Sequence, residues 1–303
     1  MASVTPRVTM AAVTGPGYGY PPPVRDGRRR RWAGGALVAW GLVLTAAVFW
    51  SVRNDPPTVP EQRDAGQALP ALRAAAGAVV EAAQEERWVL RLGELRADEC
   101  SLTPVRDGVE ISRDVTLYVA EGEAREALDS VTAGLPPAYG ASVVATRGGT
   151  RLSFYADAGE FIAIETMANS ADRVLDLHVS TGCRPESAGV DLSDPAAGPV
   201  PAELTTMVAA MKATGSGADG GSGSGESFRS AAVPCPSGGT AVVYVADGVS
   251  GDASGVPVGV PDGTTPVWSE PGEWAYRNGS ESVVVTAENA RQRATVTTGC
   301  RAG

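Results

Sequence analysis

The sequence is poor in the side chains that carry most enzyme chemistry. Its 303 residues include a single lysine, Lys212, and a single histidine, His178. Because no glycine-rich loop precedes Lys212, a P-loop is excluded, and one lysine leaves no case for a lysine nucleophile. One histidine also leaves little with which to bind a transition metal. We therefore expect no catalytic residue, no cofactor and no metal site.

Basic side chains are outnumbered. The chain has 35 acidic and 25 basic residues, which gives a net charge of −10. A nucleic-acid-binding protein would show a basic footprint. We therefore expect no nucleic acid partner.

Cysteine is scarce, and its spacing excludes two further classes. The four cysteines are Cys100, Cys183, Cys235 and Cys300. The first lies too far along the chain to serve as a lipoprotein anchor at the N-terminal apolar segment. The close Cys-x-x-Cys pairs of structural zinc sites are absent from the sequence, so disulfides are the expected use of all four.

Long apolar runs are rare as well, and one stands out. Residues 33–52 form 20 positions without a charged side chain. A helix rises about 1.5 Å per residue, so this segment can cross the roughly 30 Å hydrocarbon core of a bilayer. A cleaved signal peptide is the alternative, with residues 45–47 as its cleavage site. Because the run exceeds the signal-peptide core of about 7–15 residues, we favour a retained transmembrane helix, a signal-anchor.

Charge asymmetry orients this segment. Residues 1–32 carry six arginines and one aspartate, for +5, whereas residues 53–303 carry 19 basic and 34 acidic side chains, for −15. Arginine near a spanning segment stays in the cytoplasm. We therefore expect a single-pass cell-membrane protein with a cytoplasmic N-terminus and extracytoplasmic C-terminal domains. Residues 1–32 are predicted to be a disordered tail, and residues 53–67 a linker.

The extracytoplasmic part contains an internal repeat. Residues 180–184 read STGCR and residues 297–301 read TTGCR, while residues 116–120 read TLYVA and residues 242–246 read VVYVA. Helical apolar patterns begin near Pro70 and again near Pro201. The motifs occur in the same order in both parts, which favours a tandem duplication. Each copy then has one disulfide, pairing Cys100 with Cys183 and Cys235 with Cys300.

The repeat divides the outer region into copy one (68–186), a linker (187–199) and a shortened copy two (200–303). The predicted fold class is α+β. A single N-terminal transmembrane helix is followed by two tandem duplicated domains, each an antiparallel sheet with one or two helices on one face and one disulfide.

Periodicity places the elements of each copy. Copy one is predicted to have a first, amphipathic helix, a second helix at residues 123–134, and later strands at 141–146, 152–166 and 173–180. In copy two a Gly- and Pro-rich stretch takes the place of the second helix. Because copy two lacks this helix, we expect it to lean on copy one or to depend more on its disulfide.

His178 is the candidate for a catalytic base. It lies in a predicted strand with Asp176 and Ser180 on the same face. A Ser-His-Asp triad needs a carboxylate that orients the histidine and a serine that contacts it. Side chains two residues apart on a strand seldom form a close hydrogen bond, and no G-x-S-x-G motif supplies the serine. A solvated surface histidine is the favoured interpretation.

Two polar patterns resemble ligand sites without the required context. Residues 215–220 match G-x-G-x-x-G but follow a helix and precede a Gly/Ser coil, whereas a dinucleotide site lies between a strand and a helix. Asp247, Asp252 and Asp262 suggest calcium, but their spacing matches no known loop. We expect these three aspartates to be solvated turn residues.

One aromatic pair also suggests a ligand. Trp268 and Trp274 bracket a short polar segment and could form an aromatic platform for a glycan. In a chain with so few aromatic residues, core packing is the favoured role for both.

The leading functional hypothesis is a membrane-anchored extracytoplasmic protein of the bacterial cell envelope that is not an enzyme. It would be a protein-interaction or structural module with an envelope protein partner. A ligand-sensing or solute-binding ectodomain is the alternative, and it requires a pocket between the copies. A hydrolase with a pair of buried neighbouring carboxylates is a third, weaker hypothesis.

Overall fold

The computed structural model describes residues 27–54, 63–186, 189–194, 198–214, 228–250, 256–288 and 291–300. The chain forms two compact units, Met1–Pro56 and Pro57–Gly303. The G-x-G-x-x-G match at residues 215–220 and Asp252 lie outside the described residues.

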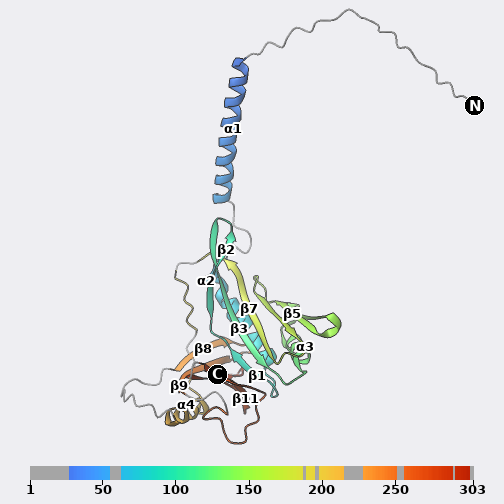
Figure 1. The fold of residues 1–303 in the computed structure, drawn as a ribbon, viewed down its shortest axis with the longest axis vertical. Coiled ribbons are helices and arrows are strands. Elements are labelled where there is room, and N and C mark those ends of the chain that lie inside the picture. The colour runs from blue at the N-terminus through green and yellow to red at the C-terminus, as the bar shows by residue number, and fades with distance from the viewer. Residues whose placement is uncertain are drawn as a thin grey trace, which may run out of the picture. The chain divides into compact units, whose positions relative to one another are not determined.

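The first unit contains helix α1 (Gly27–Asn54), shown in Figure 1. Within it, Gly34–Ser51 has a mean hydropathy of 1.6. Of the helices in the described residues, α1 is the one long and apolar enough to cross a membrane. It begins before residue 33 because the preceding arginines are good helix formers. Helix α1 is thus a candidate membrane anchor.

The second unit contains two antiparallel sheets. Sheet A consists of β1 (Val89–Leu92), β2 (Arg96–Thr103), β3 (Arg106–Tyr118), β4 (Ser142–Thr146), β5 (Arg151–Asp157), β6 (Ala163–Asn169) and β7 (Val174–Arg184). Sheet B consists of β8 (Phe228–Pro234), β9 (Thr240–Ser250), β10 (Trp268–Glu270), β11 (Glu273–Asn278), β12 (Glu281–Glu288) and β13 (Arg291–Thr298). The helices are α2 (Ala65–Ala83), α3 (Ala124–Gly134) and α4 (Ala202–Thr214).

The two sheets have the same topology, as a tandem duplication requires. Sheet A runs β2-β3-β7-β6-β5-β4, with β1 also paired to β3, and sheet B runs β8-β9-β13-β12-β11-β10. In sheet A, α2 packs on the face that holds Val115 and Val179. In sheet B, α4 packs on the face that holds Ala246 and Val296. The predicted α+β class with two tandem domains is confirmed.

Each domain holds the disulfide expected from the repeat. Cys100 of β2 is bonded to Cys183 of β7, across β3. Cys235 and Cys300, which follow β8 and β13, are bonded to each other across β9. The two bonds therefore join corresponding strands.

The threonine before each final Gly-Cys plays the same part in both sheets. The backbone N–H of Ile111 donates to Oγ1 of Thr181 over 3.0 Å, and the N–H of Val242 donates to Oγ1 of Thr298 over 3.0 Å. The threonine of the repeated Thr-Gly-Cys motif thus holds β7 against β3 in sheet A and β13 against β9 in sheet B.

Strand pairing corrects one part of the repeat. Val179 and Val296 precede the two Thr-Gly-Cys motifs at the same distance, and their strand partners are Arg113 and Tyr244. Tyr244 therefore corresponds to Arg113 and not to Tyr118. Matching the two Tyr-Val-Ala segments was wrong, because apolar alternation does not by itself fix strand register.

Several elements differ from the sequence expectations. The strand predicted over 152–166 is two strands, β5 and β6, because residues 159–161 adopt positive φ angles and turn the chain. In copy two, strands were predicted at 241–246, 282–286 and 294–298, which correspond to β9, β12 and β13. Strands β8, β10 and β11 were missed, since they are short or follow Gly- and Pro-rich segments. Within residues 256–267 no helix forms, as predicted for the loop in place of the second helix.

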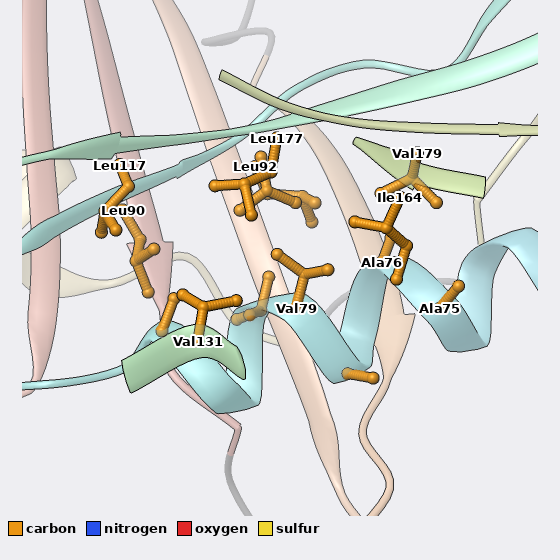
Figure 2. Packing of buried hydrophobic residues seen from close by; sticks show 14 of the residues in the cluster. Ala75, Ala76, Val79, Leu90, Leu92, Leu117, Val131, Ile164, Leu177 and Val179 are labelled. Atoms are coloured by element: carbon orange, nitrogen blue, oxygen red, sulfur yellow. The ribbon is translucent and has the colours of Figure 1, made fainter. Parts of the chain in front are cut away.

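Helix α2 is not the simple amphipathic helix that was expected. It begins at Ala65, where Asp64 Oδ1 accepts the N–H of Gln67 over 2.9 Å. Residues 75–80 are all buried. Figure 2 shows Ala76 and Val79 facing strand residues of sheet A. A helix that is apolar on all sides is surrounded by protein, and the run 74–80, AAAGAVV, already carried that signal.

The side of α2 that faces away from sheet A packs against sheet B. Val233 and Val243 belong to the same core cluster as α2. The free edge of β1 also meets sheet B, since the N–H of Leu90 donates to Ser282 Oγ over 2.9 Å. Copy two therefore packs against copy one, as one of the two expected outcomes. Both predicted copies lie within one compact unit, Pro57–Gly303.

Candidate functional site

Three of the four sheet faces in the second unit are covered. Helices α2 and α3 pack on the inner face of sheet A, and α2 with β1 packs on one face of sheet B. Helix α4 packs on the other face of sheet B. The outer face of sheet A is covered only at its β1 end, where Val89 and Tyr118 pack against sheet B. Within the described residues, the part of this face on β5, β6 and β7, which carries His178, stays exposed.

A groove of about 510 Å³ lies on this outer face. Tyr155 and Met167, on β5 and β6, line it with exposed fractions of 52% and 66%. Glu165 and Asp176 add negative charge beside these apolar side chains. Exposed apolar side chains grouped beside charged ones are typical of an interaction surface.

A row of polar side chains runs along this face into the groove. Asp114 of β3, His178 of β7, Glu165 of β6 and Tyr155 of β5 lie directly opposite one another on successive strands. Nδ1 of His178 is 2.7 Å from Oδ1 of Asp114, and Arg96 donates to the other oxygen, Oδ2. The histidine is thus oriented by a carboxylate on the neighbouring strand.

This arrangement shifts both titrations. The hydrogen bond to Asp114 raises the pKa of His178 above its ordinary value, against the opposing effect of partial burial. The same bond, helped by Arg96, holds the pKa of the Asp114 carboxyl below its usual range. The pair is therefore ionic over a wider range of pH than two isolated side chains would be.

A second cavity, of about 400 Å³, lies where the outer face of sheet A meets sheet B. Arg91 donates to Oγ1 of Thr116 over 3.2 Å, and the Thr116 hydroxyl donates to Oδ1 of Asp176 over 2.7 Å. Arg293 and Val245 of sheet B also line the cavity. This inter-copy cavity thus has charged groups of both signs contributed by both sheets.

A buried ion pair lies on the inner side of sheet A. Arg113 is fully buried and donates to Asp194, in the segment that links the two copies. Nε of Arg73, on α2, donates to the other oxygen of Asp194 over 3.2 Å. Burial lowers the pKa of Arg113. The arrangement ties the linking segment to copy one and faces no groove of the outer face.

The environment of His178 was only partly predicted. The histidine is partly exposed on the polar face, as expected. Its carboxylate partner is Asp114, 64 residues earlier, and not Asp176. Alternation in residues 112–118 does place Asp114 on a polar face, but the register that brings it opposite His178 comes from strand pairing. Among the described residues, no serine hydroxyl is hydrogen-bonded to His178.

The other candidate residues are dispersed. Asp247 accepts from Nε of Arg293 over 2.7 Å and from Arg229 over 3.1 Å, so its charge is paired within the protein. Trp268 packs in the small cluster around Tyr118, whereas Trp274 packs with the core under α4, so the two rings share no platform.

One cluster has the composition of a metal site but not its chemistry. A carboxylate oxygen of Glu81 and the sulfurs of Cys235 and Cys300 lie within 4.8 Å of one another. The two sulfurs are bonded to each other, and a disulfide offers no thiolate ligand.

No protein-family model and no curated protein matches the chain. A crystal structure of a DUF4853 family protein from Actinomyces odontolyticus aligns with a TM-score of 0.30 and 13% sequence identity, over 44% of this chain and 75% of that one.

Proposed function

We propose that this protein is a membrane-anchored extracytoplasmic binding module of the bacterial cell envelope and is not an enzyme. Its outer sheet A face would hold a segment of a partner protein. The observation that carries the proposal is the exposed part of the outer face on β5, β6 and β7, where an apolar and acidic groove remains while the other sheet faces are packed.

Charge and exposure indicate the kind of partner. Glu165 and Asp176 line the groove beside Tyr155 and Met167, while the charge of Asp114 is already paired with His178 and Arg96. A partner segment that fits would place a basic side chain near Glu165 and Asp176 and an apolar side chain on Met167. Catalysis is not part of the proposal, because the oriented histidine contacts a carboxylate and an acid-lined surface rather than a nucleophile.

The topology has a direct test. The N-terminus is proposed to lie in the cytoplasm and the Pro57–Gly303 unit outside, where disulfides form. Alkaline phosphatase fused to the C-terminus should be active, and a reporter that works only in the cytoplasm should be silent there. The opposite pattern would refute the topology.

The binding face can be tested by site-specific photo-cross-linking in intact cells. A photo-reactive residue in place of Met167 should give one discrete adduct, and the double change Glu165→Arg with Asp176→Arg should remove it. The matched control is Thr206, which is exposed on the outer side of α4 and should give no adduct. Equal adducts at both positions, or an adduct that survives the charge reversal, would exclude this face.

A second candidate function is ligand binding in the inter-copy cavity. It is favoured by Arg91 and Asp176, whose opposite charges are bridged by Thr116 rather than paired directly. A small zwitterion could place its carboxylate on the first and its ammonium on the second. Arg91→Gln would then weaken ligand binding and leave the Met167 cross-link unchanged, which separates the two candidates.

A further inference from the structure

The exposed strand edges of the two sheets are protected in different ways. The free edge of β1 is satisfied by sheet B, where Ser282 and Thr297 accept the N–H groups of Leu90 and Leu92. Strand β2 is exposed, but it carries both charge signs along its length. Strand β10 has only three residues. Short, charged or covered edges are the usual defences against strand addition.

Strand β4 has none of these defences. It ends the strand order of sheet A, and no strand in the described ranges pairs with its outer edge. Its five residues, SVVAT, contain no charge and no proline. Val144 is 55% exposed, whereas Val143 and Ala145 face the core. An uncharged, β-branched, unpaired edge of this kind is a template for another strand.

We propose that the outer edge of β4 pairs in an antiparallel manner with β4 of a second copy of this chain. Two-fold symmetry about Val144 places this residue opposite its own counterpart and Ser142 opposite Thr146. Each pair then joins similar side chains, and Ser–Thr pairs and β-branched pairs are favourable across strands. No like charges meet at the axis, as they would in a strand with one charged residue at its centre.

The dimer would also extend the apolar surface of the outer face. Val144 lies opposite Ser153 of β5, which in turn lies opposite Met167 of β6. A two-fold axis perpendicular to the sheet keeps both outer faces on the same side, so the exposed Val144 side chains of the two copies pack on each other. Two chains anchored in one membrane also meet at a raised effective concentration, which favours a small interface.

The pairing is tested by disulfide trapping of the full chain in membranes. All four native cysteines are bonded in pairs, so an introduced cysteine is the single free thiol. Val144→Cys should give a covalent dimer that is about twice the monomer mass on a non-reducing gel and is lost on reduction. The matched control, Val105→Cys, changes a valine that is 70% exposed at the β2–β3 turn and should stay monomeric.

The register has its own readout. Ser142→Cys and Thr146→Cys should each fail to link with themselves, because in the dimer identical positions lie about 13 Å apart along the strands. Expressed together, the two variants should form a mixed dimer. Val144→Lys should remove dimers in sedimentation and leave the circular dichroism spectrum of the chain unchanged, since the side chain is exposed in the monomer.

Three outcomes overturn the proposal. Equal trapping at Val144 and Val105 would show random collision of anchored chains. A Val144 adduct to a different protein would assign the edge to a foreign strand. Monomer at every position in membranes would show that β4 stays unpaired. None of these results touches the Met167 cross-link, which tests the proposed function separately.

Discussion

The outer face of sheet A and the corresponding face of sheet B have opposite characters. Strand pairing matches four positions of one row in the two sheets: Asp114, His178, Glu165 and Tyr155 in sheet A with Val245, Thr295, Val284 and Ala275 in sheet B. The row in sheet A is polar and uncovered, and the row in sheet B is mainly apolar and buried against copy one.

This difference shows how two duplicated domains form one compact unit. A face that is apolar in copy two packs on α2 and β1 of copy one, so the copies stack in a head-to-tail manner. The matching row in copy one is polar, which ends the stack as a polar cap ends a repeat array. One duplicated surface has thus become the interface with copy one in copy two, and an exposed face in copy one.

Exchanging one matched pair is the strongest test of this comparison. Val284 is 1% exposed at the interface of sheet B with copy one. Val284→Glu introduces there the residue type of Glu165, the matching position on the exposed face of sheet A. Losing the burial of an apolar side chain and burying a carboxylate should cost about 4 kcal/mol or more of unfolding free energy. Urea unfolding of the 57–303 unit, followed by circular dichroism, measures it.

The mirror change is its control. Glu165→Val, on the exposed face, should alter the unfolding free energy by less than about 0.5 kcal/mol. Equal losses for the two changes would mean that the outer face of sheet A is also buried, and the comparison would fail.

The linking segment gives the next largest effect. Asp194→Ala leaves the buried Arg113 without its carboxylate, and removal of one partner of a buried pair costs about 3–5 kcal/mol. Asp191→Ala, in the same segment but exposed, is the control and should cost less than about 1 kcal/mol. Differential scanning calorimetry compares the two; similar melting temperatures would show that Asp194 does not secure the linker.

A close approach of α2 to sheet B predicts a smaller loss of stability. A Cβ added at Gly77 of α2 would lie 1.8 Å from the carbonyl oxygen of Pro234, so α2 and sheet B would have to separate. Gly77→Ala should cost about 1–3 kcal/mol, as overpacking usually does. Ala74→Ser, at an exposed position of the same helix, should cost little. A Gly77→Ala protein as stable as the parent would show that α2 does not pack this closely against Pro234 of sheet B.

The smallest effect concerns pH. The pKa of His178 is raised in the folded protein, so its contribution to stability is complete below the unfolded pKa and is lost as pH rises through the folded pKa. Because the side chain is partly exposed, the contribution should stay below about 1 kcal/mol.

The single histidine makes this measurable. The pH titration of its ring C–H resonance in NMR should give a pKa above the ordinary value of about 6.5. Asp114→Asn should bring this pKa back toward the ordinary value. The pKa of Asp114 is lowered in the folded protein, so Asp114 contributes to stability above its unfolded pKa. This contribution is lost at acid pH, as the pH falls through the folded pKa. An unchanged histidine titration in Asp114→Asn would mean that the pair does not form in solution.

Local signals carried much of the architecture. Charge-free length identified α1 as a candidate anchor, and motif order predicted both disulfides and the duplication. These features depend on runs and spacings that are written along the chain. The replacement of the second helix in copy two followed in the same way from its Gly and Pro content.

What only the tertiary structure decided is which surfaces meet. The match of Tyr244 with Arg113, the contact of Asp114 with His178 and the burial of α2 on both sides all depend on strand register and on the stacking of two sheets. Alternation along a strand shows that two faces differ, but the same pattern fits several registers and either neighbour. The open face could therefore be located only after the packing of every other face was known, since it is the surface left when the apolar faces have been buried.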